Sequence, residues 1–178
     1  GEYKRSCHES SIRVPTVLTG PGFKGGGQVR ELVSLVDLPP TLLDAAGIYV
    51  PAHMQGRSLM PLLKGVSDEW PEEVFVQISE AQTARAVRTQ RWKYGVDAPG
   101  ESGPGSDTYV EQYLYDLQTD PYELNNLVGH QSHAGVAEVM SQRLIRRMRG
   151  AGEDEPKIER AEVRRSGQRT VSEEERYA

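Results

Sequence analysis

The sequence is poor in cysteine and in large aromatic side chains, with one Cys, two Trp and two Phe among its 178 residues. A single cysteine, Cys7, excludes an internal disulfide framework and a cysteine-rich metal site. No apolar run approaches the roughly 20 residues that cross a bilayer, so we expect no membrane partner. Basic residues are outnumbered, at 21 Lys plus Arg against 26 Asp plus Glu. Nucleic-acid binding needs a basic face that releases counterions, so we expect no nucleic-acid partner either.

The sequence also lacks an initiator methionine, because it begins at Gly1. This start indicates either a processed chain or a piece of a longer protein. Composition separates the stretches 1–27, 28–65, 66–127 and 133–149. From Gly150 onward apolar residues become rare and charges of both signs dominate, which predicts a disordered tail or a loosely attached helix.

Two patterns within residues 1–65 predict regular structure. The apolar residues at 14–18, followed by a Gly-Pro-Gly turn, predict a short buried strand. Residues 38–46 predict a helix, because Asp37 is placed to cap its first turn and two prolines fall where missing N–H groups cost least. A glycine then follows at the expected helix end. The side chains expected to face inward are Leu42, Leu43 and Ala46.

The sequence of residues 66–149 indicates an antiparallel sheet followed by a helix. The expected strands, rich in β-branched and aromatic residues, are 74–78, 84–88, 91–96 and 113–117. A segment rich in Gly, Pro and Ser at 98–107 predicts an exposed loop. Apolar residues at every fourth position predict an amphipathic helix over 133–149. The residues of this stripe are Val136, Met140, Leu144 and Met148.

The first residues form the densest group of reactive side chains. Lys4 and Arg5 precede Cys7, His8 and Glu9, so two cations, a thiol, an imidazole and a carboxylate lie close together in sequence. Such a group fits an oxyanion-binding site, and it equally fits a surface cluster of ion pairs. A Cys–His catalytic pair normally comes from separate elements, so we expect the thiol to be a small, partly buried side chain.

A second group of carboxylates, Asp116 and Asp120, has a simpler explanation than acid–base chemistry. The dipeptide Asp120-Pro121 is typical of a turn in which the aspartate accepts hydrogen bonds from its own backbone. We therefore expect a structural turn at this position. Taken alone, these residues provide no complete set of catalytic groups.

Several segments, in order, resemble the type I sulfatase family. They are KRSCHESSIRVP at 4–15, VSLVDLPPTLLDAAG at 33–47, GRSLMPLL at 56–63, KY at 93–94 and LYDLQTDPYELNNL at 114–127. The resemblance implies an alkaline-phosphatase-like α/β fold, of which this chain holds an α+β part. It implies that 1–65 end the catalytic domain, that 66–149 form a C-terminal subdomain with an antiparallel sheet and a packed helix, and that 150–178 are a tail.

The same resemblance implies hydrolysis of sulfate esters by a formylglycine nucleophile with a divalent cation, usually calcium. The expected substrate is a small-molecule or carbohydrate sulfate ester. Lys4 matches the family lysine that contacts the sulfate, and His8 is placed to line a substrate subsite. Glu9 and Arg13 match positions expected to form a buried structural ion pair, and Asp37 is expected to be structural as the helix cap.

The sequence also departs from the family pattern. Cys7 is not the formylglycine precursor, because Glu9 stands where proline is required and Ser11 where arginine is required. The nucleophile and the metal ligands are absent, so we expect no metal site in this chain, no activity by itself, and an N-terminal catalytic portion as its partner.

Two other functions fit the residues. One is a phosphonate or phosphate monoesterase of the same superfamily, and the other is a non-catalytic C-terminal domain for substrate selection or interaction. The family resemblance is compatible with a periplasmic, secreted or cytoplasmic location.

Overall fold

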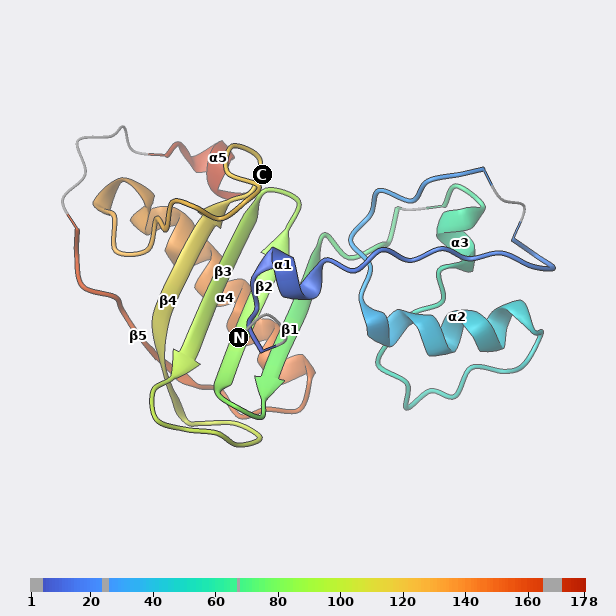
Figure 1. The fold of residues 1–178 in the computed structure, drawn as a ribbon, viewed down its shortest axis with the longest axis horizontal. Coiled ribbons are helices and arrows are strands. Elements are labelled where there is room, and N and C mark those ends of the chain that lie inside the picture. The colour runs from blue at the N-terminus through green and yellow to red at the C-terminus, as the bar shows by residue number, and fades with distance from the viewer. Residues whose placement is uncertain (1–4, 24–25, 67, 165–170) are drawn as a thin grey trace. The chain divides into compact units, whose positions relative to one another are not determined.

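The computed structural model describes residues 5–23, 26–66, 68–164 and 171–178 (Figure 1). The chain forms two compact units. One unit comprises residues 15–74, and the other combines residues 1–14 with 75–178.

The unit of residues 15–74 contains a 3-10 turn, η1 (Leu35–Asp37), and the helices α2 (Leu38–Ala45) and α3 (Met60–Leu63). The helix predicted over 38–46 is confirmed by α2, which carries prolines in its first turn. Gly47 follows with a φ of 70°, the left-handed conformation that commonly ends a helix.

Asp37 caps a different turn from the one predicted. Its Oδ2 accepts a hydrogen bond of 2.8 Å from the backbone N of Ser34, and its Oδ1 accepts one of 2.8 Å from the backbone N of Arg57. The side chain makes no capping hydrogen bond to α2. The carboxylate therefore closes η1 and ties the loop at Arg57 to the start of the helix.

The inward face of α2 differs in part from the predicted one. Leu42 is 57% exposed and Ala46 is exposed, Leu43 is half-buried, and the buried residues are Pro40 and Thr41. Thr41 Oγ1 donates to the carbonyl of Asp37 at 2.6 Å and accepts from the backbone N of Leu59 at 2.9 Å. The helix turns its threonine toward the segment before α3, because this polar contact and the buried Leu59 hold the two together.

The buried strand predicted at 14–18 is wrong. These residues have irregular backbone, and Val17 is 89% exposed. A strand needs a neighbour to satisfy its backbone groups, and among the described residues no strand pairs with this segment.

The other unit is built on a five-stranded sheet with the order β1-β2-β3-β4-β5. Its strands are β1 (Glu73–Ser79), β2 (Thr83–Thr89), β3 (Trp92–Ala98), β4 (Thr108–Asp116) and β5 (Lys157–Glu159). Strands β2, β3 and β4 are antiparallel neighbours, as the sequence predicts. The added strand β5 runs parallel to β4, so the sheet is mixed rather than wholly antiparallel.

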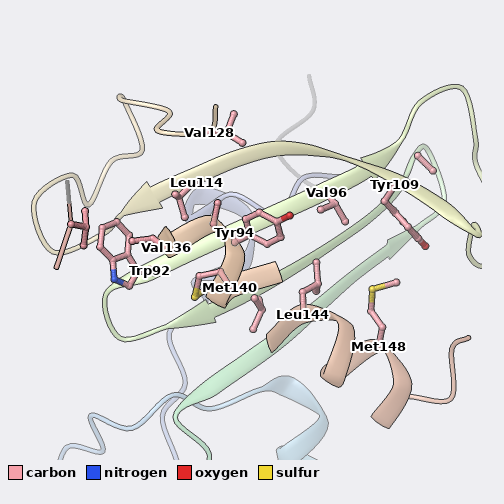
Figure 2. Close-up of a cluster of buried hydrophobic side chains, with 14 residues drawn as sticks. Trp92, Tyr94, Val96, Tyr109, Leu114, Val128, Val136, Met140, Leu144 and Met148 are labelled. Atoms are coloured by element: carbon pink, nitrogen blue, oxygen red, sulfur yellow. The ribbon is translucent and has the colours of Figure 1, made fainter. Parts of the chain in front are cut away.

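One face of the sheet is covered by α4 (Ala134–Gly150), which follows the 3-10 turn η2 (Gln131–His133). The predicted stripe of α4 is fully buried against aromatic and aliphatic side chains of β3 and β4 (Figure 2). Packed there are Trp92, Tyr94, Val96, Tyr109, Leu114, Val136, Met140, Leu144 and Met148. This core confirms the prediction of a sheet with a helix packed on it. No helix of the described residues has the length and apolar character needed to cross a bilayer.

A bulge in β4 changes which face its side chains occupy. The register with β3 shifts between Gly95 and Val96, which face Tyr113 and Glu111 respectively. An extra residue in one strand reverses the alternation beyond it. Glu111 therefore contacts Tyr94 on the α4 side, whereas Tyr113 packs with Cys7 on the opposite face.

Composition predicts disorder from residue 150 onward, and the structure describes residues 150–164 and 171–178 of this segment. They contain β5 and the short helix α5 (Glu173–Arg176). Val171 is buried in the α4 core, and the indole N–H of Trp92 donates to the carbonyl of Glu175 at 3.0 Å. The described tail residues therefore contact both the sheet edge and the core.

Candidate functional site

The candidate site is the segment that precedes and includes α1 (Glu9–Ile12), on the sheet face opposite α4 (Figure 1). Lys4, the predicted sulfate contact, lies outside the described residues. His8 and Glu9 both lie in this segment, as their sequence positions require. Asp37 belongs to the other unit.

Glu9 is buried, but its partners differ from those predicted. Its Oε1 lies 3.3 Å from Arg88 Nε on β2 and 3.5 Å from Lys93 Nζ on β3. Arg13 is exposed, so the predicted buried Glu9–Arg13 pair is wrong. The physical reason is that Arg88 and Lys93 of the sheet already pair with Glu9. Arg13 follows the end of the four-residue helix α1 and is exposed.

Lys93 has a side chain that is 0% exposed. Its Nζ donates a hydrogen bond of 2.8 Å to the carbonyl oxygen of Cys7 and forms an ion pair with Glu123 Oε1. A buried ammonium requires such compensation, because an unpaired charge in the interior is strongly disfavoured.

Glu123 completes the attachment of the segment. Its Oε2 accepts a hydrogen bond of 2.8 Å from the backbone N of Glu9, the first residue of α1. Its φ of 59° places it in the left-handed region, which is uncommon for a residue other than glycine. The preceding Asp120 accepts from the backbone N of Leu124 at 3.0 Å and of Asn125 at 2.7 Å, which confirms the predicted structural turn.

The roles of Lys93 and Glu123 were not predicted from the sequence. Both stand in segments that resemble the sulfatase family, KY at 93–94 and LYDLQTDPYELNNL at 114–127. A lysine within a strand of otherwise apolar and aromatic residues is the local signal for a buried, paired charge. Its partner comes from a distant turn, and nothing in the local pattern identifies it.

His8 lies beside two tyrosines of β4. The ring centroid of His8 is 5.1 Å from that of Tyr113 and 5.9 Å from that of Tyr115. Tyr115 Oη lies 3.5 Å from His8 Nε2, and the two tyrosine rings stack at 5.5 Å. Half-buried imidazole beside phenol rings combines an apolar surface with hydrogen-bonding edges.

Cys7 is a buried thiol, as the sequence predicts. It is 2% exposed and packs against Ala84 and Ala86 of β2. Burial raises the pKa of the Cys7 thiol, although a hydrogen bond with Tyr113 opposes this shift. A neutral, covered thiol is a poor nucleophile, so the environment favours a packing role.

The described residues offer no group of three or more His, Cys, Asp and Glu side chains that could hold a metal ion. The divalent cation implied by the family resemblance therefore has no fitting site within them. What they do form is a network of charges that fixes backbone, with one half-buried imidazole at its edge.

The profile of the family described as N-sulphoglucosamine sulphohydrolase, C-terminal, matches residues 2–150, and the chain belongs to this family. Human arylsulfatase K is 37% identical to it over 135 residues, which are 70% of this chain and 24% of that protein. The extracellular sulfatase SULF-1 homolog of Drosophila melanogaster is 37% identical over 94 residues, or 50% of this chain and 8% of that protein. The chain thus spans about a quarter of the length of arylsulfatase K.

Solved structures agree with this assignment. The 2-O GAG sulfatase BT1596 is 30% identical, with a TM-score of 0.60 over 74% of this chain and 29% of that chain. BT4656, solved with its substrate D-glucosamine-2-N,6-O-disulfate, is 26% identical, with a TM-score of 0.58 over 67% of this chain and 24% of that chain. The fold class expected from the sequence, an α+β part of an alkaline-phosphatase-like fold, is confirmed by these neighbours and by the five-stranded sheet.

Proposed function

We propose that this chain is the C-terminal part of a sulfatase that hydrolyses a carbohydrate sulfate ester. The observation that carries the proposal is the family match over residues 2–150, together with 37% identity to a sulfatase of which the matched residues make up 24%. The nucleophile and the cation belong, in this proposal, to the remainder of the protein. The isolated chain is then inactive.

Within that enzyme, Lys4 contacts the sulfate group. An ammonium is suited to this role, because negative charge develops on the sulfuryl and leaving-group oxygens as the ester bond breaks. A divalent cation held by the remainder neutralises sulfate oxygens when bound. The residues described in the structure contribute by holding the backbone at Cys7 and Glu9, a few positions further along the chain.

His8 lines the sugar side of the site. Its imidazole edge can donate to or accept from a sugar hydroxyl, and the adjoining rings of Tyr113 and Tyr115 limit how it can turn. BT4656 acts on a disulfated glucosamine. That substrate supports a sulfated amino sugar as the first compound to test.

The domain division expected from the sequence, with 1–65 ending a catalytic domain, 66–149 forming a subdomain and 150–178 a tail, is part of the proposal. It is supported by large apolar side chains on the unit of residues 15–74 that remain exposed. They are Val17, Val29, Leu35, Val36, Leu42, Ile48, Tyr49, Leu63 and Val66. In this proposal these side chains contact the catalytic remainder.

The test uses the full-length protein with a panel of sulfated sugars and measured sulfate release. We expect turnover of at least one sulfated amino sugar, a kcat at least 100-fold lower in Lys4→Ala, and a raised KM in His8→Ala. Lys157→Ala, at a position of β5 where the side chain is 70% exposed, is the control and keeps wild-type kinetics. Unchanged kcat in Lys4→Ala would refute the assignment of the sulfate contact.

The same assay separates the alternatives. A phosphonate monoester hydrolase from Silicibacter pomeroyi shares the fold, with 23% identity and a TM-score of 0.59. Preference of the full-length protein for phosphonate monoesters over sulfate esters would replace our proposal with that chemistry. Binding of sulfated sugars without any turnover would instead support a non-catalytic domain for substrate selection.

A further inference from the structure

The backbone of residues 7–9 forms hydrogen bonds with two side chains that are far apart in sequence. Lys93 Nζ donates to the carbonyl of Cys7, and Glu123 Oε2 accepts from the backbone N of Glu9. His8 lies between these two anchored peptide groups. The positions of Lys93 and Glu123 therefore constrain the backbone of His8, from which its ring extends.

The two anchors are also joined to each other. Lys93 and Glu123 form an ion pair, with side chains that are 0% and 5% exposed. Glu9 adds a second carboxylate at 3.5 Å from Lys93 and is shared with Arg88. Two carboxylates thus face one fully buried ammonium. Removal of any one of these three charges alters the electrostatic environment of the other two.

A buried ion pair of this kind is poorly explained by stability alone. Apolar residues of similar volume often stabilise a protein as well or better, because charges lose their hydration on burial. Hydrogen bonds of charged groups, unlike apolar contacts, are directional. They therefore constrain where the bonded backbone groups lie. The left-handed backbone at Glu123, uncommon for a residue other than glycine, also favours a role that specifies geometry.

We propose that Lys93 and Glu123 are positioning residues that set the backbone of residues 7–9 and thereby orient His8 toward the substrate. This inference rests on the proposed function for the role of His8. The attachment of the segment by the ion pair is independent of that function. The two parts are therefore tested separately.

The attachment is tested with the 178-residue chain, in which Cys7 is the only thiol. Because Cys7 is buried, its reaction with Ellman's reagent at pH 8 reports how often the segment opens. We expect Glu123→Gln and Lys93→Met to raise the labelling rate at least tenfold. The matched control Glu111→Gln alters the Glu111–Arg160 pair on the α4 side of the sheet, away from Cys7, and leaves the rate within twofold.

Urea unfolding of every variant, followed by circular dichroism, separates local opening from global loss of stability. Faster labelling of Glu123→Gln than of a control with the same unfolding midpoint supports the attachment. Labelling rates that simply follow the midpoint in all variants would overturn it. Glu123→Gln is the milder change, since an amide oxygen can still accept from Glu9 N, and it keeps the test usable where Lys93→Met fails to fold.

The positioning role is tested by steady-state kinetics of the full-length protein on its sulfated sugar. Glu123→Gln is expected to raise KM about tenfold in the wild-type background and less than twofold in the His8→Ala background. An equal effect on KM in both backgrounds would show that Glu123 does not act through His8 and would overturn the role. A full-length protein without sulfatase activity would refute the proposed function and with it this positioning role, while the labelling result still decides the attachment.

Discussion

The ring of Tyr113 lies directly over Gly95 on the neighbouring strand. The two residues are cross-strand partners at the bulge of β4, and a Cβ built at Gly95 would come within 2.2 Å of the Tyr113 ring. A glycine here lets the aromatic ring lie flat on the backbone. The ring is thereby placed beside His8 and over Cys7, so this strand pair shapes the floor of the candidate site.

Gly95→Ala is accordingly expected to destabilise the chain. The added methyl group must displace Tyr113, and overpacking of this kind costs about 1–3 kcal/mol. Urea unfolding followed by circular dichroism measures the loss. Gly103→Ala is the control, because a Cβ at Gly103 meets nothing within 4 Å. Equal stability of the two variants would show that Tyr113 moves aside freely.

Arg85 provides a second test of the sheet. Its side chain is 0% exposed and donates to both carboxylate oxygens of Glu153, at 2.8 and 3.0 Å, and to the carbonyl of Ile78 at 2.9 Å. Arg85→Met leaves these acceptors without their donor, so we expect a loss of about 3–5 kcal/mol in unfolding free energy.

The contrast for Arg85 is the exposed Arg149–Glu155 pair, with both side chains more than half exposed. Arg149→Met is expected to cost less than about 1 kcal/mol, because water screens an exposed pair. The same denaturation assay compares the two variants. A loss in Arg85→Met as small as in Arg149→Met would contradict the assigned contacts.

Glu111 links the tail to the sheet. Its Oε1 accepts from Tyr94 Oη and Arg160 Nη1, each at 3.0 Å, and its Oε2 accepts from the backbone N of Ala161 at 2.9 Å. Glu111→Gln replaces one acceptor oxygen by a donor. We expect hydrogen exchange of residues 157–164 to accelerate at least tenfold, and Tyr94→Phe to leave that exchange unchanged. Slow exchange in Glu111→Gln would show that β5 alone retains the tail.

Asp97 is expected to make the stability of the chain depend on pH. Burial raises the pKa of Asp97, with the hydrogen bond from Gln112 acting in the opposite direction. The folded state therefore holds this proton more tightly, and stability falls as pH rises from the unfolded pKa through the folded one. Asp97→Asn removes this penalty, because the amide stays neutral.

Because Asp97 is only half buried, solvent limits the gain from Asp97→Asn to about 0.5 kcal/mol at pH 7. The advantage should vanish near pH 3, where the wild-type carboxyl is protonated in both states. Thermal unfolding at the two pH values measures it. A variant that is less stable than wild type at pH 7 would show that the Gln112 contact outweighs burial.

The elements that sequence reasoning predicted well are those that depend on local pattern. The stripe of α4 repeats at helical spacing, and β2 and β3 form a hairpin around a short turn, so neighbouring residues determine them. The turn at Asp120 is local for the same reason. The family segments, likewise, are contiguous in sequence and could be compared directly.

The features that were mispredicted depend on distant partners. The segment at 14–18 has strand-like composition but no paired strand among the described residues, and Leu42 has helical spacing but no apolar surface against it within its unit. Glu9 was paired with Arg13 because both residues match positions that the family resemblance assigns to structure. Its actual partners, Arg88 and Lys93, are delivered by the fold of the sheet.

We propose above all that this chain is part of a larger sulfatase and is inactive alone. Release of inorganic sulfate from a sulfated amino sugar, measured side by side for the 178-residue chain and the full-length protein with calcium present, tests it most directly. We expect sulfate release by the full-length protein and only the buffer blank for the isolated chain. Sulfate release by the isolated chain, or none by the full-length protein, would contradict it.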